Sequence, residues 1–240
     1  MASPRATARL RPSPLSDEQG VVERHKQAAA QAAAELVQNG MRVGLGTGST
    51  VAHLLGAIAA RRLRGLRCVA TSPATERAAR ELGLKVEELD EVGELDIAID
   101  GADQIDPAGW LIKGGGAAQT REKIVAAAAK RFVVIASAEK AVQELVPPVP
   151  LEILHFGARC TLDALSPARL REVPDSPDGN LIADYLGEIG DPAQLAARLS
   201  ATPGVVEHGL FVPELVSEML IAGENGIERR LGGKRDQPAD

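Results

Sequence analysis

The chain has 240 residues, of which 45% are hydrophobic, 25% are charged and 2% are aromatic, and its formal net charge is −6. This composition predicts a globular protein with an ample core. The negative charge and the few aromatic residues argue against nucleic-acid binding, which relies on basic patches and stacking surfaces. No stretch approaches the roughly 20 apolar residues that span a membrane, so we expect no membrane partner.

The two cysteines, Cys68 and Cys160, and the four histidines are scattered along the chain. Their spacing fits neither a metal site nor a disulfide framework. We therefore expect no metal and no cofactor. Free thiols also favour a cytoplasmic location, where cysteines stay reduced.

From about residue 18, helices alternate with short apolar strands. The hydrophobic pattern predicts helices over 16–37, 50–63, 73–83 and 121–131, and strands over 41–45, 68–72, 85–89, 95–100 and 132–137. Such alternation implies βαβ units. The expected fold class is α/β, with an open, mostly parallel, Rossmann-like sheet that carries helices on both faces, plus a smaller α+β domain.

The regular alternation of helices and strands ends where prolines cluster, near residues 145–154. We expect a small α+β domain over 147–211, in the order strand-helix-strand-helix-strand. The Rossmann-like domain then comprises 18–146 and 212–231. Residues 1–17 and 232–240 are expected to be disordered tails.

Polar loops follow the expected strands. Ligands of open α/β sheets bind beyond the carboxyl ends of the strands, so these loops form the candidate site. They comprise residues 46–50 (GTGST), then Thr71, Ser72 and Thr75, then residues 100–103 (DGAD), residues 113–116 (KGGG) and Lys140. Together they offer hydroxyls, bare amides, two aspartates and two lysines at one rim.

The GTGST segment lies between a strand and a helix, where backbone amides at a helix N-terminus bind phosphate well. It is not a Walker loop, because no Gly-Lys-Ser/Thr is present. It is not the dinucleotide fingerprint either, because Ser49 stands where the third glycine belongs. Taken alone, an ordinary glycine turn with a helix cap fits this loop equally well.

Three carboxylates accompany these loops. Asp100 and Asp103 by themselves fit Asx turns, and Glu122 by itself fits a surface residue paired with Arg121 or Lys123. Beside two lysines and a triple glycine, the three together indicate acid–base chemistry on a phosphorylated hydroxy-carbonyl compound. In such chemistry a carboxylate takes the proton beside the carbonyl, and donors stabilise the enediolate that forms.

The segments VGLGTGST, DGADQI, KGGGAAQTREK and IASAEK, in this order, resemble ribose-5-phosphate isomerases of the A type over about residues 20–228. The resemblance implies a cofactor-free aldose–ketose isomerase of the non-oxidative pentose phosphate pathway. It implies that Glu122 accepts the proton, while Asp100, Asp103 and Lys113 share the remaining chemistry in a division left open. The substrate contacts it implies are Thr47, Gly48, Ser49, Thr50, Asp100, Gly101, Ala102, Asp103, Lys113, Gly114, Gly115, Gly116 and Lys140. The chain departs from the family pattern at Gln104 and Gln119.

Two other functions fit parts of this pattern. A sugar-phosphate sensor of a transcription regulator would carry a helix-turn-helix, and the head of this chain is too short and too proline-rich for one. A sugar-phosphate deaminase or lactonase needs a histidine or another acid–base set, and no histidine lies in the polar loops.

The family resemblance also implies a homodimer or a homotetramer. The apolar segment 145–154 and the small domain are expected to offer strands with exposed edges, which a second copy would cover.

Overall fold

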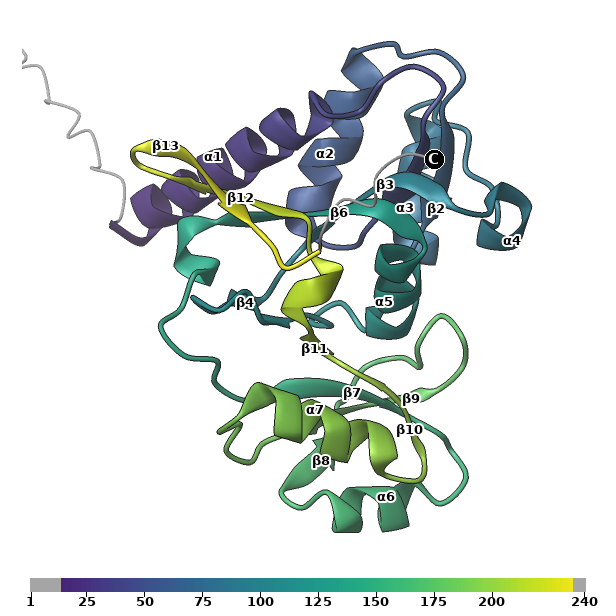
Figure 1. Cartoon of the computed structure of the whole chain (residues 1–240), viewed down its shortest axis with the longest axis vertical. Helices are drawn as coiled ribbons and strands as arrows, with labels where there is room; N and C mark the ends of the chain where they lie inside the picture. The colour runs from purple at the N-terminus through teal and green to yellow at the C-terminus, as the bar shows by residue number, and fades with distance from the viewer. Residues whose placement is uncertain (1–13, 235–240) are drawn as a thin grey trace, which may run out of the picture.

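The computed structural model describes residues 14–234, with side chains from residue 18 onward (Figure 1). Most of each expected tail, residues 1–13 and 235–240, lies outside the described residues. The first helix begins at Pro14, and the backbone of 232–234 is hydrogen-bonded to residues 213–217. No helix in the described part of the chain combines the length and apolarity needed to cross a membrane.

A six-stranded sheet forms the centre of the molecule, in the order β13-β12-β6-β3-β1-β2. All neighbouring strands pair in parallel except β12 and β13, which form a hairpin. The strands are β1 (Arg42–Leu45), β2 (Arg67–Ala70), β3 (Leu95–Gly101), β6 (Ala129–Ser137), β12 (Glu218–Gly223) and β13 (Gly226–Leu231). The expected open, mostly parallel sheet is thus confirmed.

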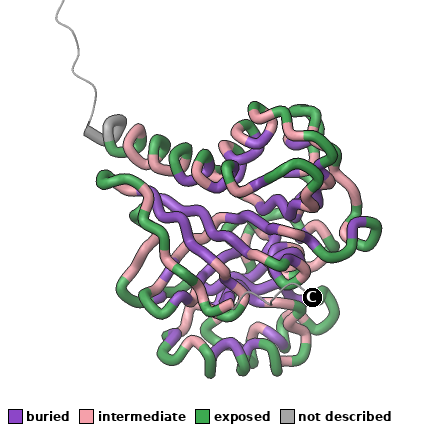
Figure 2. The backbone as a smooth tube through the Cα atoms, turned by 45° about the horizontal axis from the view of Figure 1, so that its top comes forward, coloured by how far each residue is buried: buried purple, intermediate pink, exposed green. Residues whose placement is uncertain are grey.

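Each face of this sheet is covered by different elements. Val133 and Ile135 of β6 lie in the core under α1 (Pro14–Ala34), α2 (Ser49–Ala60) and α3 (Pro73–Glu81). Their neighbours Phe132 and Val134 lie in the opposite core. That second core is closed by α5 (Gln119–Ala127) and by a three-stranded sheet of β4 (Gln104–Ile105), β5 (Leu111–Ile112) and β11 (Leu210–Phe211). Figure 2 shows the buried residues concentrated along the central strands.

One expected strand is absent from the main sheet, and one expected helix ends earlier than expected. Residues 85–89 make only one bridge, from Val86 to Cys68, before the chain turns into the short helix α4 (Leu89–Val92). The helix expected over 121–131 ends at Ala127, because the following residues pair with β3 and extend β6. Pairing with β3 outweighs helix propensity after Ala127, whereas residues 85–89 lack the pairing that a strand needs.

The segment between β6 and β11 contains a separate antiparallel sheet, in the order β10-β7-β9-β8. Its elements are β7 (Val149–Ile153), α6 (Ala158–Ala164), β8 (Ala168–Leu170), β9 (Leu181–Tyr185), α7 (Pro192–Ala201) and β10 (Val205–His208). We call residues 149–208 the small module. Its order is β-α-β-β-α-β, the ferredoxin-like arrangement, with one strand more than expected.

The extra strand and the position of β7 correct two expectations about the small module. β8 is short and its residues are largely exposed, so its sequence carries no apolar signal. β7 is paired on both sides, by β9 and by β10, so the apolar segment 145–154 does not offer an exposed edge. The edges of this sheet are β8 and β10.

Gly44 in β1 lets α5 approach the central sheet closely. A Cβ at this position would stand 2.5 Å from Cγ1 of Val125 on α5 and 2.9 Å from Cβ of Ala98 on β3. The packing of α5 against the sheet therefore requires a residue without a side chain.

We expect Gly44→Ala to lower the free energy of unfolding by about 1–3 kcal/mol, because the added methyl overpacks the contact with Val125. Gly56→Ala is the matched control. Gly56 lies inside α2 with no atom within 4 Å of an added Cβ. That change should stabilise the protein by about 0.5–1 kcal/mol through helix propensity. Urea denaturation measures both, and a Gly44→Ala protein as stable as the unsubstituted one would contradict the packing argument.

Candidate active site

The candidate site lies where the strand order of the central sheet reverses. In chain order the sheet begins at β1, adds β2 on one side and continues through β3 and β6 on the other. The loops after β1 and β3 therefore diverge at their carboxyl ends and leave a crevice, the usual ligand site of doubly wound sheets. The GTGST loop follows β1 and the DGAD segment spans the end of β3.

A cavity of about 310 Å³ occupies this crevice. Its lining includes all the expected substrate-contacting residues except Asp100, which is buried directly behind the wall. The expected lining residues are Thr47, Gly48, Ser49, Thr50, Gly101, Ala102, Asp103, Lys113, Gly114, Gly115, Gly116, Glu122 and Lys140. Thr71, Ser72 and Thr75 do not line the cavity; they are buried beneath the GTGST loop.

The GTGST loop is held from below by side-chain hydrogen bonds. The Thr47 hydroxyl lies 2.8 Å from that of Thr71, and the Thr75 hydroxyl donates to the carbonyl of Gly46. Gly46 packs against Asp100 so closely that a Cβ would stand 1.9 Å from the aspartate Oδ1. The last two residues of this loop, Ser49 and Thr50, begin the first turn of α2, and the amides of this turn have no partner within the helix.

A short hairpin that the sequence pattern did not reveal brings Asp103 beside Lys113. β4 and β5 pair antiparallel, and Asp106 closes the turn by accepting from the amide of Trp110. Asp103 and Lys113 are the residues that flank this hairpin. Asp103 also accepts a hydrogen bond from the amide of Gly115, at 2.8 Å.

Two buried carboxylates share one buried lysine at the back of the cavity. Nζ of Lys113 lies 2.8 Å from Oδ2 of Asp100 and 3.2 Å from Oε2 of Glu122. All three residues are at most 4% exposed. Asp100 also accepts from the amides of Thr47 and Gly101, whereas Oε2 of Glu122 makes no hydrogen bond of good geometry with any described residue.

These surroundings separate the two carboxyl groups chemically. Burial and, after it, the negative charge of Asp100 raise the pKa of Glu122 to about 8, against the opposing effect of Lys113. Burial raises the pKa of Asp100 too, but Lys113 and two amides stabilise its charged form. For Lys113 the two carboxylates outweigh burial, so its pKa lies above the usual value and the ammonium stays charged. Asp100 therefore has more donors to stabilise its charged form than Glu122 has.

Four residues near the site were missed by the sequence analysis. Val22 and Lys26 of α1 line the cavity, as does Glu139, which precedes Lys140. Arg171 of the small module donates to the carbonyls of Gly114 and Gly115, at 3.0 and 3.3 Å. Lys26 follows Val22 by one helical turn, so the two residues share a half-buried face of α1. Arg171 gave no signal in the sequence, because its contact is made across the fold.

Neither the cavity nor the rest of the described chain contains a metal-binding constellation. Within residues 14–234, no three side chains of His, Cys, Asp or Glu gather closely enough to hold a metal ion. The described residues that line the cavity include no histidine. His53 lies on α2 and pairs with Glu23 at 2.6 Å.

Known proteins share both the sequence and this fold. The chain matches the family model of ribose 5-phosphate isomerase A (phosphoriboisomerase A) over residues 67–226. The ribose-5-phosphate isomerase A of Caulobacter vibrioides (strain NA1000 / CB15N) is 47% identical over 219 residues, which cover 85% of this chain and 96% of the relative.

Solved structures agree. The crystal structure of ribose 5-phosphate isomerase A from Neisseria gonorrhoeae has a TM-score of 0.84 and 30% identity, covering 88% of this chain and 97% of that one. A D-ribose-5-phosphate isomerase solved in complex with phospho-erythronic acid has a TM-score of 0.83 and 32% identity, covering 88% and 99%.

The fold and these similarities define an aldose–ketose isomerase, an enzyme that moves a carbonyl between adjacent carbons of a sugar. The chain belongs to the ribose 5-phosphate isomerase A family, and its reaction interconverts D-ribose 5-phosphate and D-ribulose 5-phosphate. The resemblance carried by the sequence motifs is thereby confirmed. The roles of the individual residues stay predictions.

Proposed function

We propose that Glu122 is the base of this isomerase and moves one proton between C2 and C1 of the sugar. The observation that carries the proposal is a carboxylate that is buried, lines the cavity and lies 3.2 Å from the Lys113 ammonium. Starting from the aldose, Glu122 removes the proton from C2, and the electron pair of that C–H bond forms a C1–C2 double bond. The carbonyl oxygen becomes the enediolate oxygen, and Glu122 then returns the proton to C1.

Lys113 and the two aspartates complete this chemistry. The Lys113 ammonium, fixed by Asp100 and by the carbonyl of Gly101 at 2.6 Å, stabilises the negative charge on the enediolate oxygen. Asp103 lines the cavity and transfers the hydroxyl proton between the two oxygens. Asp100 faces Lys113 and the GTGST loop, so its role is to hold the lysine rather than to contact the sugar.

The substrate phosphate binds at the N-terminus of α2. The amides of the first helical turn have no partner in the helix, and Lys26 and Lys140 line the same cavity. Within the described chain no hydrogen bond engages the hydroxyls of Ser49 and Thr50, whereas Thr47 is already bonded to Thr71. The related enzyme solved with phospho-erythronic acid binds a phosphorylated compound, which supports this assignment.

The proposal extends to the organisation of the chain. The two domains are 18–146 with 212–231, and 147–211; the separate sheet of the small module and the pairing of β12 with β6 support this division. The chain crosses back at Gly209, and β11 pairs with β5, which favours a boundary slightly before residue 211. A cytoplasmic location is proposed from the two free thiols, one buried and one exposed.

We expect Glu122→Gln to lower kcat by about 10²–10⁴-fold, equivalent to roughly 3–5 kcal/mol of activation free energy, with a modest change in KM. Glutamine keeps the size of the side chain but cannot accept a proton. The assay follows ribulose 5-phosphate formed from ribose 5-phosphate. A variant with near-normal kcat would show that another residue is the base.

The pH dependence of kcat/KM should rise with pH and level off near pH 8. Only the ionised carboxylate can accept the proton, and Glu122 is protonated below its raised pKa of about 8. Well below that pH the rate should change about tenfold per unit. The Glu122→Gln variant should lose this limb. A profile that is flat between about pH 6 and 9 would contradict the role of Glu122.

Ser49→Ala should raise KM about tenfold or more and leave kcat nearly unchanged. Each hydrogen bond to a charged group contributes about 1.5–3 kcal/mol, and a bond to the phosphate is made equally in the ground and transition states. Free ribose should accordingly be a very poor substrate. Comparable kcat/KM for ribose and ribose 5-phosphate would refute phosphate binding at α2.

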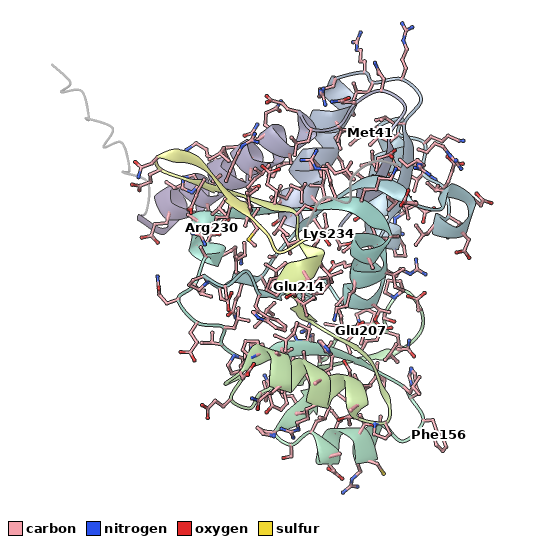
Figure 3. The ribbon with its side chains drawn as sticks, in the orientation of Figure 1. Met41, Phe156, Glu207, Glu214, Arg230 and Lys234 are labelled. Atoms are coloured by element: carbon pink, nitrogen blue, oxygen red, sulfur yellow. The ribbon has the colours of Figure 1, made fainter. Side chains whose placement is uncertain are left out.

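A homodimer or homotetramer is proposed from apolar side chains exposed on the small module. Phe156 is 93% exposed, and Leu154 and Val206 are 46% and 38% exposed. Figure 3 shows Phe156 directed away from the ribbon at the far end of this module. Such apolar patches commonly mark interfaces. Light scattering at micromolar concentration should give at least twice the chain mass of 25.1 kDa, and a monomer mass would overturn the proposal.

A further inference from the structure

The residues that surround Glu122 in the Thr-Arg-Glu-Lys segment of α5 all bond to the small module. Thr120 donates to Glu152, Arg121 pairs with Asp178, and Lys123 donates to Glu207 at 2.7 Å. Glu122 alone lies against the cavity and Lys113. One turn of helix is thus fixed from the small module on one side and presents the base on the other.

Glu152 is the most buried of these partners. It lies in the central strand β7 and is 1% exposed. One of its oxygens accepts from Thr120, and the other accepts from Ser176 at 2.6 Å and Asn180 at 2.8 Å. A buried carboxylate with three donors holds its partners in one geometry, because any displacement leaves charge uncompensated in the interior.

Arg171 makes a corresponding contact with the glycine loop. Its guanidinium bonds to both carboxylate oxygens of Asp184 on β9 and also to the carbonyls of Gly114 and Gly115. Planar, bidentate pairing orients the arginine firmly. The loop it holds carries the Gly115 amide, which in turn binds Asp103.

The remaining contacts differ in strength. Lys123 is partly buried and also donates to the carbonyl of His208, and its Nζ stands 4.9 Å from the centre of the Phe211 ring. Figure 3 shows Glu207 in the region between α5 and the small module. Arg121 and Asp178 are both well exposed, so solvent weakens their pairing.

We propose that the small module acts as a clamp on the active site, in which Glu152 positions Glu122 through Thr120 and Arg171 positions the glycine loop through its carbonyls. This inference rests on the proposed role of Glu122 as the base. Neither residue touches the substrate cavity. Their contribution is geometric, since misplacement of a reacting group by about 1 Å can cost about 10²-fold in rate.

Two conservative variants test the clamp from its two ends. Thr120→Val replaces one hydroxyl by a methyl and removes the bond to Glu152 without leaving a cavity. Arg171→Met keeps the length of the side chain and removes its hydrogen bonds. We expect Thr120→Val to lower kcat about tenfold or more with little change in KM, and Arg171→Met to raise KM as well, because the loop binds substrate.

Asp191→Ala is the control for loss of stability in the small module. Asp191 caps α7 by accepting from the amides of Ala193 and Gln194, and it lies outside the cavity and the clamp. This variant should melt at a lower temperature, yet keep kcat and KM within about twofold. If Asp191→Ala lost as much activity as the two clamp variants, general destabilisation would explain the results and the proposal would be wrong.

A double-mutant cycle shows whether Thr120 acts through Glu122. In a Glu122→Gln background, Thr120→Val should lower the residual rate by less than about twofold, since the group it positions can no longer accept a proton. When Glu122 is retained, Thr120→Val should loosen the helix turn and expose the Glu122 carboxyl to water. The pKa of Glu122 should then fall, and the rise of kcat/KM with pH should move below pH 8. Equal losses in both backgrounds, or an unmoved pH limb, would overturn positioning by Glu152.

Failure of the clamp and failure of the base assignment are distinguishable. A near-normal kcat of Glu122→Gln would show that Glu122 is not the base. It would also refute the proposal that Glu152 positions Glu122 for catalysis. The second arm of the clamp is then decided by Arg171→Met, whose KM should still rise relative to Asp191→Ala. Thr120→Val and Arg171→Met that both keep kcat and KM within about twofold would overturn the clamp even with Glu122 established as the base.

Discussion

Two buried carboxylates that share one buried lysine are the constraint around which this site is organised. Lys113, Asp100 and Glu122 come from three separate segments and are almost fully removed from water. An isolated charge in such a place would be very unfavourable, and the cluster is tolerable because Lys113 lies within about one hydrogen-bond length of both carboxylates. Burial, and after it the negative charge of Asp100, raise the pKa of Glu122 to about 8 in this cluster.

The fold satisfies this constraint by bringing three chain segments to the switch point of the sheet. Asp100 ends β3, Lys113 follows the β4–β5 hairpin, and Glu122 lies in the first turn of α5. The absence of a side chain at Gly44 lets α5 pack on β1, and Gly46 leaves room for Asp100. The same contacts that close the second hydrophobic core therefore set the distances between the charged groups, so stability and site geometry are coupled.

The small module extends this coupling beyond the central sheet. Its own core is separate, yet it contacts the active-site helix through Glu152 and the glycine loop through Arg171. The backbone itself crosses there, where Lys113 donates its amide to the carbonyl of Gly209. The small module has no residue on the cavity wall. It nevertheless contacts α5, which carries Glu122, and the segment that carries Lys113.

The sequence by itself determined the fold class, the family and nearly all the residues of the cavity wall. Short segments of sequence are enough for these features, because the glycine loops at strand ends and the helices that follow them are each encoded within a few residues. It did not determine the β4–β5 hairpin, strand β8, the end of α5 or the interior position of β7. Each of these depends on pairing with a distant segment.

The contacts of Arg171 and Glu152 likewise depend on residues that are distant in the sequence. An arginine and a glutamate in a soluble chain are ordinarily surface residues, and nothing near them in sequence marks them otherwise. Only the tertiary structure decided that Glu152 is buried against Thr120, that Arg171 reaches the glycine loop, and that burial raises the pKa of Glu122. The physical reason is that burial and the distance between charges exist only in the folded chain. Desolvation and Coulomb interaction then set the behaviour of these side chains, and neither can be read from neighbouring residues in the sequence.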